Sequence, residues 1–384
     1  MRTRLALALP GLLLLALSGC ESLGGRKEPD APTELADFTA ELRLEREWSR
    51  DLGRGERRLR AGMAPAELEG VVYAASPDGR LVAVELESGR ERWVVRDGPR
   101  FASTPGLGEG LVVLGTLDGE VVAYDAPSGA ERWRAAVSSE VIAAPAVGDG
   151  IVAVRAHDGR VFGLAVEDGS RRWVYDRGVP LLSLRGNGAP LLRGGVVFVG
   201  HDDGRLVALR AAEGTVLWEA ALSAREGRSE IERLGDVDGQ LAIVGSDVYG
   251  VGFRGQAAAL TVEGGRSLWT RELSSASGLA LGGRLLFAAD HEGVIHALER
   301  TGGAPLWRQE ALRFRDPSRP AAESDLVVVG DYEGYLHVLA ADDGRLLGRT
   351  RAGRGAIRGA PLVAGERVVV LDSRGRLSAF RIVR

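Results

Sequence analysis

Residues Ala83–Trp93 read AVELESGRERW, and their pattern of a small residue, a glycine and a tryptophan returns along the chain. The glycine follows the small residue by six positions, and the tryptophan follows the glycine by four. The same spacing occurs in Ala123/Gly129/Trp133, Gly163/Gly169/Trp173, Ala208/Gly214/Trp218, Ala259/Gly265/Trp269 and Ala297/Gly303/Trp307. Self-similarity at a fixed period is typical of a repeat architecture.

A second glycine lies ten residues before the glycine of the pattern, at Gly79, Gly119, Gly159, Gly204, Gly255 and Gly293. A seventh block keeps Gly334, Val338 and Gly344 but has Gly348 where tryptophan is expected. An eighth block has Gly375 and Ala379, and the chain ends before its tryptophan. Trp48, near the other end, is expected to supply it. All seven tryptophans then have one docking role: Trp48, Trp93, Trp133, Trp173, Trp218, Trp269 and Trp307.

Each block predicts a small antiparallel sheet. In one block the apolar runs Leu111–Thr116 and Val121–Asp125 flank an Asp-Gly turn, and Glu131–Arg134 follows a second turn. Short β-branched runs around such turns are typical of hairpins. A segment such as Ala143–Val147 provides an innermost strand. Four antiparallel strands in about 40 residues form the unit of a β-propeller blade.

The split eighth block predicts a closed ring. Pro361–Val363, Val368–Ser373 and Leu377–Ile382 supply three strands, and Leu42–Trp48 is expected to pair as the fourth. An open solenoid would also show a repeat, but it would not divide one block between the two ends of the chain. We therefore predict an all-β fold, an eight-bladed propeller over residues 41–384, with indole rings wedging the blades apart at the rim.

Composition narrows the function classes. The formal net charge of −4 disfavours a general nucleic-acid binder, and a single cysteine excludes disulfides within the chain and thiolate metal clusters. His157, His201 and His291 are expected at turns near the rim. His296 and His337 are expected on strands, without a carboxylate at ligand spacing. We expect no metal site, no cofactor and no catalytic residue.

The amino terminus has the form of an export signal. Arg2 and Arg4 precede an apolar run, Leu5–Leu17, which is short for a membrane span but suits a signal peptide. Leu17-Ser18-Gly19-Cys20 resembles a bacterial lipobox, which implies a lipid on Cys20; the alternative is an ordinary signal peptide with an incidental cysteine. We predict a lipoprotein signal peptide over residues 1–20 and a flexible tether over 21–40.

The pattern of small residue, glycine and tryptophan resembles the tryptophan-docking repeat of PQQ-dependent quinoprotein dehydrogenases. That enzyme family needs a vicinal cysteine pair, calcium ligands and a catalytic aspartate. The single cysteine and the length of the chain argue against such an enzyme here.

The whole chain resembles the BamB family, the propeller lipoproteins of the machine that inserts β-barrels into the bacterial outer membrane. Two long connections, Val174–Pro190 and Glu219–Leu241, carry the specific matches. Leu181–Gly186 resembles the family's Leu-x-Leu-Arg-Gly segment, and Ser229–Asp238 resembles its acidic segment, although Gly239-Gln240 departs from the residues expected next. The resemblance implies a BamA-docking surface made of Leu182, Leu184, Arg185, Asp236 and Asp238.

The bland alternative is that Leu182 and Leu184 are core residues and that Asp236 and Asp238 cap a turn. The family resemblance further implies a scaffold, anchored by lipid at the periplasmic face of the outer membrane, that binds a POTRA domain of BamA. Unfolded β-barrel proteins would be further partners, added at exposed blade edges. Two other hypotheses remain, an envelope propeller that binds polysaccharide or peptidoglycan, and a PQQ-dependent dehydrogenase.

Overall fold

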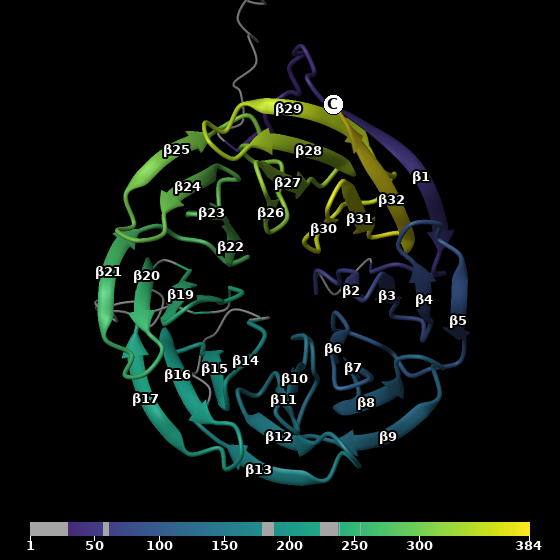
Figure 1. The fold of residues 1–384 in the computed structure, drawn as a ribbon, viewed down its shortest axis with the longest axis vertical. Coiled ribbons are helices and arrows are strands. Elements are labelled where there is room, and N and C mark those ends of the chain that lie inside the picture. The colour runs from purple at the N-terminus through teal and green to yellow at the C-terminus, as the bar shows by residue number, and fades with distance from the viewer. Residues whose placement is uncertain (1–29, 57–60, 179–187, 223–236, 238, 254) are drawn as a thin grey trace, which may run out of the picture.

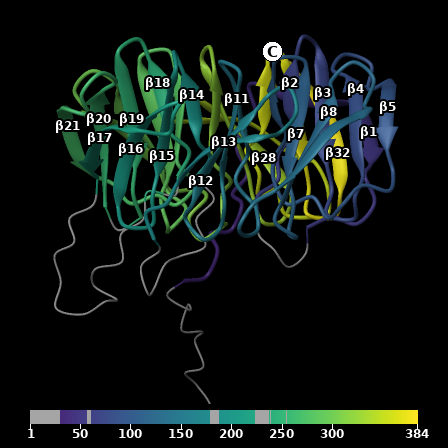
Figure 2. The same ribbon diagram turned by 90° about the horizontal axis from the view of Figure 1, so that it is seen from below.

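The computed structural model describes residues 30–56, 61–178, 188–222, 237, 239–253 and 255–384. In these ranges the chain forms eight four-stranded antiparallel sheets that follow one another around a ring (Figure 1). Edge-on, the ring is a flat disc (Figure 2). The prediction of an all-β, eight-bladed propeller is confirmed.

Seven blades take their strands in chain order. Blade 1 consists of β2 (Ala66–Leu68), β3 (Val71–Ala75), β4 (Leu81–Glu85) and β5 (Glu91–Val95). Blade 2 consists of β6 (Gly106–Gly108), β7 (Leu111–Gly115), β8 (Glu120–Asp125) and β9 (Glu131–Ala136). Blade 3 consists of β10 (Ala146–Gly148), β11 (Ile151–Arg155), β12 (Val161–Ala165) and β13 (Arg171–Tyr175). Blade 4 consists of β14 (Leu191–Arg193), β15 (Val196–Gly200), β16 (Arg205–Arg210) and β17 (Val216–Ala221). Blade 5 is β18 (Ala242–Val244), β19 (Asp247–Val251), β20 (Gln256–Thr261), β21 (Ser267–Glu272).

Blade 6 consists of β22 (Leu279–Gly282), β23 (Leu285–Ala289), β24 (Ile295–Glu299) and β25 (Pro305–Gln309). Blade 7 consists of β26 (Ala321–Glu323), β27 (Leu326–Gly330), β28 (Tyr335–Ala340) and β29 (Leu346–Arg351). Blade 8 joins the two ends of the chain in the order β30 (Leu362–Ala364), β31 (Arg367–Leu371), β32 (Arg376–Val383), β1 (Arg43–Asp51). The predicted innermost segment Ala143–Val147 is displaced, because β10 begins only at Ala146.

The core lies between the blades. Every residue of β3, β7 and β11 is buried, because the second strand of a blade packs against a neighbouring blade on both faces. Outer strands bury mainly their tryptophan, as in β9 with only Trp133 buried. The apolar runs of the sequence therefore become the inner layers of the ring.

Each tryptophan lies directly opposite the small residue that the repeat predicts. Trp93 pairs with Ala83 and Trp173 with Gly163, and the remaining blades repeat this register. The indole Nε1 of Trp93 donates a hydrogen bond to the carbonyl oxygen of Ala126 in the next blade, at 2.9 Å. The other six indoles donate to the next blade in the same way, at 2.7–2.9 Å. The tryptophan column thus ties every blade except blade 7 to its successor.

The glycine of the pattern belongs to the same contact, which the sequence did not reveal. Gly129 has a φ of +73°, and a Cβ there would lie 2.6 Å from the indole of Trp93 in the preceding blade. Gly89, Gly169, Gly214, Gly265, Gly303 and Gly344 face the preceding indole in the same way. Glycine is required both by the left-handed backbone and by the ring packed against it.

Blade 8 closes the ring as expected, with Trp48 opposite Ala379. The strand begins one residue later than predicted, at Arg43. Leu42 is instead buried in the cluster that contains Val338 and Leu347 of blade 7. It lies against Gly348, where the tryptophan of blade 7 is missing, so a leucine from the amino-terminal end partly fills that place.

Part of the expected tether is docked on the propeller. The amide of Thr33 donates to the carbonyl of Arg313 at 3.0 Å, and Leu35 packs against the core of blades 6 and 7. The guanidinium of Arg349 stacks over the ring of Phe38 at 5.3 Å. Thr33, Leu35 and Phe38 therefore contact the ring, while the flexibility expected of residues 21–40 stays a prediction.

The expectation for the strand histidines was wrong in one respect. His296 Nε2 lies 2.8 Å from Asp290, and His337 Nε2 lies 3.2 Å from Asp331. Each aspartate opens a turn and its histidine lies on the strand that follows, so a separation of six residues brings them together. Among the residues described, no three or more His, Cys, Asp or Glu side chains come together as a metal site.

Candidate partner-binding face

The five residues of the predicted docking surface, Leu182, Leu184, Arg185, Asp236 and Asp238, lie outside the described residues, as does Cys20. The structure describes the ends of the two connections that carry them. Gly178 and Gly188 flank the connection from blade 3 to blade 4, and Leu222 and Val237 flank the one from blade 4 to blade 5. In an antiparallel meander the connections between blades all run along one face of the ring, so these ends share a face.

Val237, between the two predicted aspartates, is anchored in the core. It is fully buried, in a cluster with Phe198 and Leu222. Its amide donates to the carbonyl of His201 at 3.1 Å, and its carbonyl lies against Gly200, where no side chain would fit. Asp236 and Asp238 are thus covalently attached to a fixed point between blades 4 and 5.

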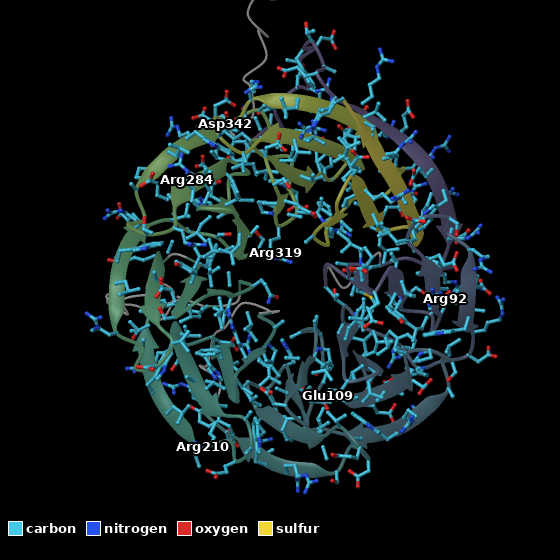
Figure 3. All side chains as sticks on the ribbon, in the orientation of Figure 1. Arg92, Glu109, Arg210, Arg284, Arg319 and Asp342 are labelled. Atoms are coloured by element: carbon cyan, nitrogen blue, oxygen red, sulfur yellow. The ribbon has the colours of Figure 1, made fainter. Side chains whose placement is uncertain are left out.

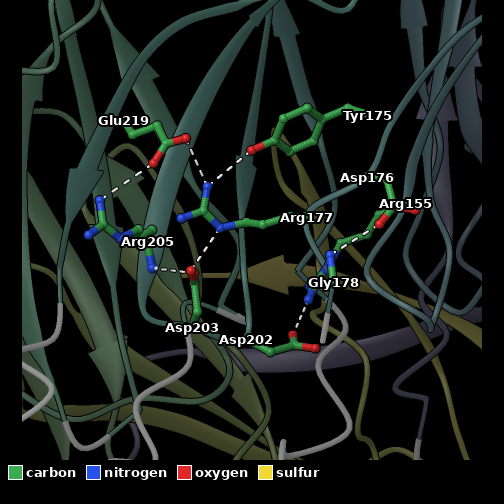
Figure 4. A network of polar contacts seen from close by, with 9 residues as sticks. All are labelled: Arg155, Tyr175, Asp176, Arg177, Gly178, Asp202, Asp203, Arg205 and Glu219. Carbon is green, nitrogen blue, oxygen red and sulfur yellow. Dashed lines mark hydrogen bonds and ion pairs between the residues drawn. The ribbon is translucent and has the colours of Figure 1, made fainter. Parts of the chain in front are cut away.

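Arg177 holds the end of the other connection. It donates to Asp203 at 2.7 Å, to Glu219 at 2.9 Å and to the hydroxyl of Tyr175 at 3.0 Å (Figure 4). Burial opposes its charge, but the bonds to Glu219 and Asp203 raise the pKa of Arg177 above its ordinary value. A guanidinium bonded in a fork to several oxygens is a rigid contact, and here it ties blade 3 to blade 4.

A buried ion pair lies beneath this network. Arg155, at the end of β11, pairs with Asp202 in the turn of blade 4, and the two side chains are 4% and 7% exposed. Removing one partner of such a pair leaves a buried charge without compensation, at a cost of about 3–5 kcal/mol. The interface between blades 3 and 4 is therefore specified by charge as well as by apolar packing.

His201 lies at the centre of this region. It is in a turn, as predicted, but it is buried between blades 3 and 4 and not at the rim. Its ring meets Tyr175 edge-on at 5.7 Å, and its Nε2 has no hydrogen-bond partner among the described residues. Burial first, and then the nearby Arg155, lower the pKa of His201 to about 3. The imidazole is neutral at physiological pH.

Sequence reasoning missed Tyr175, Arg177, Asp203 and Glu219. A signal was available, because Arg177 and Glu219 lie within the two long connections that the sequence marks. Among the described residues, this face offers a rigid platform in which Arg177 is already paired with Asp203 and Glu219, and it presents two neighbouring connections. Within the described part of the chain, no helix is long and apolar enough to cross a bilayer.

Comparisons of this chain with known proteins agree on one family. The model of the family described as outer membrane protein assembly factor BamB matches residues 44–114, 78–309 and 291–383. The outer membrane protein assembly factor BamB of Pseudomonas aeruginosa is 49% identical over 263 residues, 68% of this chain and 69% of that protein.

Solved structures agree. The crystal structure of BamB from Moraxella catarrhalis superposes with a TM-score of 0.80 at 27% identity, covering 88% of this chain and all of that one. A europium-containing methanol dehydrogenase superposes with a TM-score of 0.70 at 14% identity, covering 89% of this chain and 93% of that one. The latter likeness is one of fold alone.

Proposed function

The chain belongs to the BamB family of outer membrane protein assembly factors, and from this we propose that it is a non-enzymatic scaffold that binds a POTRA domain of BamA through the connections joining blades 3, 4 and 5. The observation that carries the proposal is the anchoring of both connections on one face. Arg177 holds the start of the first, and Val237 holds the end of the second.

The five family-matched residues have suitable chemistry. Leu182 and Leu184 supply apolar anchors, and arginine is a preferred hot-spot residue, which favours Arg185. Asp236 and Asp238 flank buried Val237 in the sequence, and in an extended segment alternate residues would face the same way. The fixed position of Val237 lowers the entropy lost when a partner binds this segment.

The amino terminus supports attachment to a membrane. A lipid on Cys20 would anchor the protein at the periplasmic face of the outer membrane. Because Thr33 is docked, only 13 residue steps separate it from Cys20, which span at most about 45 Å. The ring would stay close to the bilayer, within reach of a membrane-embedded partner.

A pull-down with the purified POTRA domains of BamA tests the proposal. Wild-type protein is expected to retain a POTRA domain, and Arg185→Glu is expected to lose most of the binding because a hot-spot cation becomes an anion. Arg92→Glu is the matched control, since Arg92 lies on the outer strand β5, remote from blades 3–5 (Figures 1 and 3). Absence of wild-type binding, or equal loss in both variants, would refute the proposed surface.

A further inference from the structure

The eight blades surround a central channel of about 510 Å³, lined by residues of every blade. The lining includes the residue two positions before each innermost strand. In six blades this residue is small, Ala64, Thr104, Ala144, Ala189, Ser277 and Ala360; in blade 5 it is Gln240, and in blade 7 it is Arg319. Arg319 is therefore the one charged side chain at this position of the ring, and Figure 3 shows it beside the central opening.

Arg319 has little compensation for its charge. Its one hydrogen bond to a described residue runs from Nη1 to the carbonyl of Leu279, at 3.3 Å. Among the described residues no carboxylate forms an ion pair with it, and burial lowers its pKa from the ordinary value. The exposed Asp316 also lines the channel mouth, without pairing to Arg319. An arginine stays protonated in such surroundings, so the charge persists.

A second cation lines the same channel. Arg358 of blade 8 donates to the backbone carbonyl of Glu56 at 3.2 Å, while its Nε is buried without a hydrogen-bond partner in the described chain. The Glu56 carboxylate accepts from the amides of Gly62 and Met63, at 3.3 and 3.2 Å. The Glu56 carboxylate interacts with the charge of Arg358 and offsets part of it, whereas no described carboxylate does so for Arg319.

Arg319 is half-buried in the channel, and a planar guanidinium matches the oxygens of carboxylates and phosphates in a bidentate geometry. The volume of the channel falls in the range of small-molecule sites, and its short side chains leave the guanidinium accessible. We propose that the channel binds a small anion bearing a carboxylate or phosphate group, held by Arg319 with Arg358 beside it. Both arginines belong to blades 7 and 8, whereas the proposed POTRA surface belongs to the connections that join blades 3, 4 and 5.

Two anions test the proposal, both at constant ionic strength set with chloride. Binding of inorganic phosphate is measured by titration calorimetry and phosphorus NMR, and binding of citrate by titration calorimetry. Wild type is expected to show saturable binding of at least one of the two anions, which also tells phosphate from carboxylate recognition. Arg319→Gln is expected to weaken that binding about tenfold or more, because a charge-assisted fork is lost. Arg284→Gln, at an exposed side chain of the ring surface, is the control and is expected to bind like wild type.

Arg319→Gln should fold, since it removes a charge that the fold leaves uncompensated; if it does not, Arg319→Lys serves, with weaker binding expected because the fork is lost. No saturable binding to wild type, or equal binding in the arginine 319 and arginine 284 variants, would overturn the channel site. Retained POTRA binding in Arg319→Gln would show that the two surfaces act separately.

Discussion

At the scale of single residues, the distance between neighbouring blades is set by the contact of a turn glycine with the tryptophan indole of the preceding blade. Gly129 lies on Trp93 of the preceding blade, and its left-handed backbone turns the chain beneath the ring. The same glycine thus serves a turn in its own blade and a packing contact with another. A pair of glycines with nearly equal backbone conformation separates these two effects.

Gly129→Ala and Gly110→Ala form that pair, with φ of +73° and +75°. A Cβ at Gly110 meets nothing within 4 Å, so alanine there is expected to cost only the left-handed strain, about 1–2 kcal/mol. At Gly129 the indole must also move, which adds about 1–3 kcal/mol of overpacking. Urea unfolding of both variants measures the difference, and equal losses would show that the indole contact is unimportant.

His201 predicts a pH dependence of stability. Its pKa is about 3 in the folded protein and about 6.5 in the unfolded chain, so between these values only the unfolded chain takes up the proton. Stability contributed by the neutral imidazole is therefore complete above pH 6.5 and is lost as the pH falls toward 3.

Because of this histidine, the free energy of unfolding of wild type is expected to fall by about 2 kcal/mol between pH 7 and pH 5. Glutamine does not titrate, so the free energy of unfolding of His201→Gln should fall by about 2 kcal/mol less than that of wild type over the same pH range. Urea unfolding at both pH values measures this difference. Comparing the change with pH, and not the absolute stability, removes the packing cost of the substitution. Parallel pH profiles for the two proteins would contradict the burial of a neutral His201.

At the scale of elements, β1 decides whether the ring is closed. It supplies the outer edge of blade 8, and Trp48 donates to the carbonyl of Leu86 in blade 1 at 2.9 Å. The last and first blades are joined through a strand from the opposite end of the chain. Closure removes the open edge of β32, a segment that would otherwise be free to pair with another molecule.

A chain that begins at Gly53 is expected to lose the burial of Trp48, roughly 4–6 kcal/mol as an upper estimate, and to self-associate through β32. A chain that begins at Glu41 retains β1 and Leu42 and is expected to remain monomeric, with a smaller loss from the docked segment around Thr33. Thermal melting and analytical ultracentrifugation compare the two. Similar melting and monomeric behaviour in both would mean that β1 does not seal the ring.

At the scale of the whole molecule, the outer rim is uneven. The residue before the tryptophan is Arg92, Arg132 and Arg172 in blades 1–3, and in blades 4–6 it is Leu217, Leu268 and Leu306, which are 41–43% exposed. Each leucine lies on an outer strand with an open edge. Unfolded barrel strands alternate apolar and polar residues, so an added strand could bury these leucines.

Photo-cross-linkers at Leu268 and Arg132 test this part of the proposed scaffold role. The Leu268 position is expected to capture unfolded barrel protein several-fold more efficiently, because a β-augmented strand gains apolar contact there in addition to backbone hydrogen bonds. Binding along every blade edge alike would give equal capture, and no capture at either position would remove barrel proteins as direct partners.

The sequence alone determined the eightfold architecture and its closure, because a spacing of six and four residues sets the register of Trp93 with Ala83 in every complete block. It also placed Trp48 opposite Ala379. Local periodicity was sufficient for these features, since each blade is built from nearby residues and repeats the same contact.

Only the tertiary structure decided the contacts between residues far apart in the chain. Gly129 meets the indole of another blade, Leu42 partly fills the place of a missing tryptophan, and Arg319 lines the central channel. Within one block these residues look like an ordinary turn, a strand start and a surface charge. Their roles arise when the ring closes, because closure brings the blades together and desolvates groups that carry no signal in their own segment.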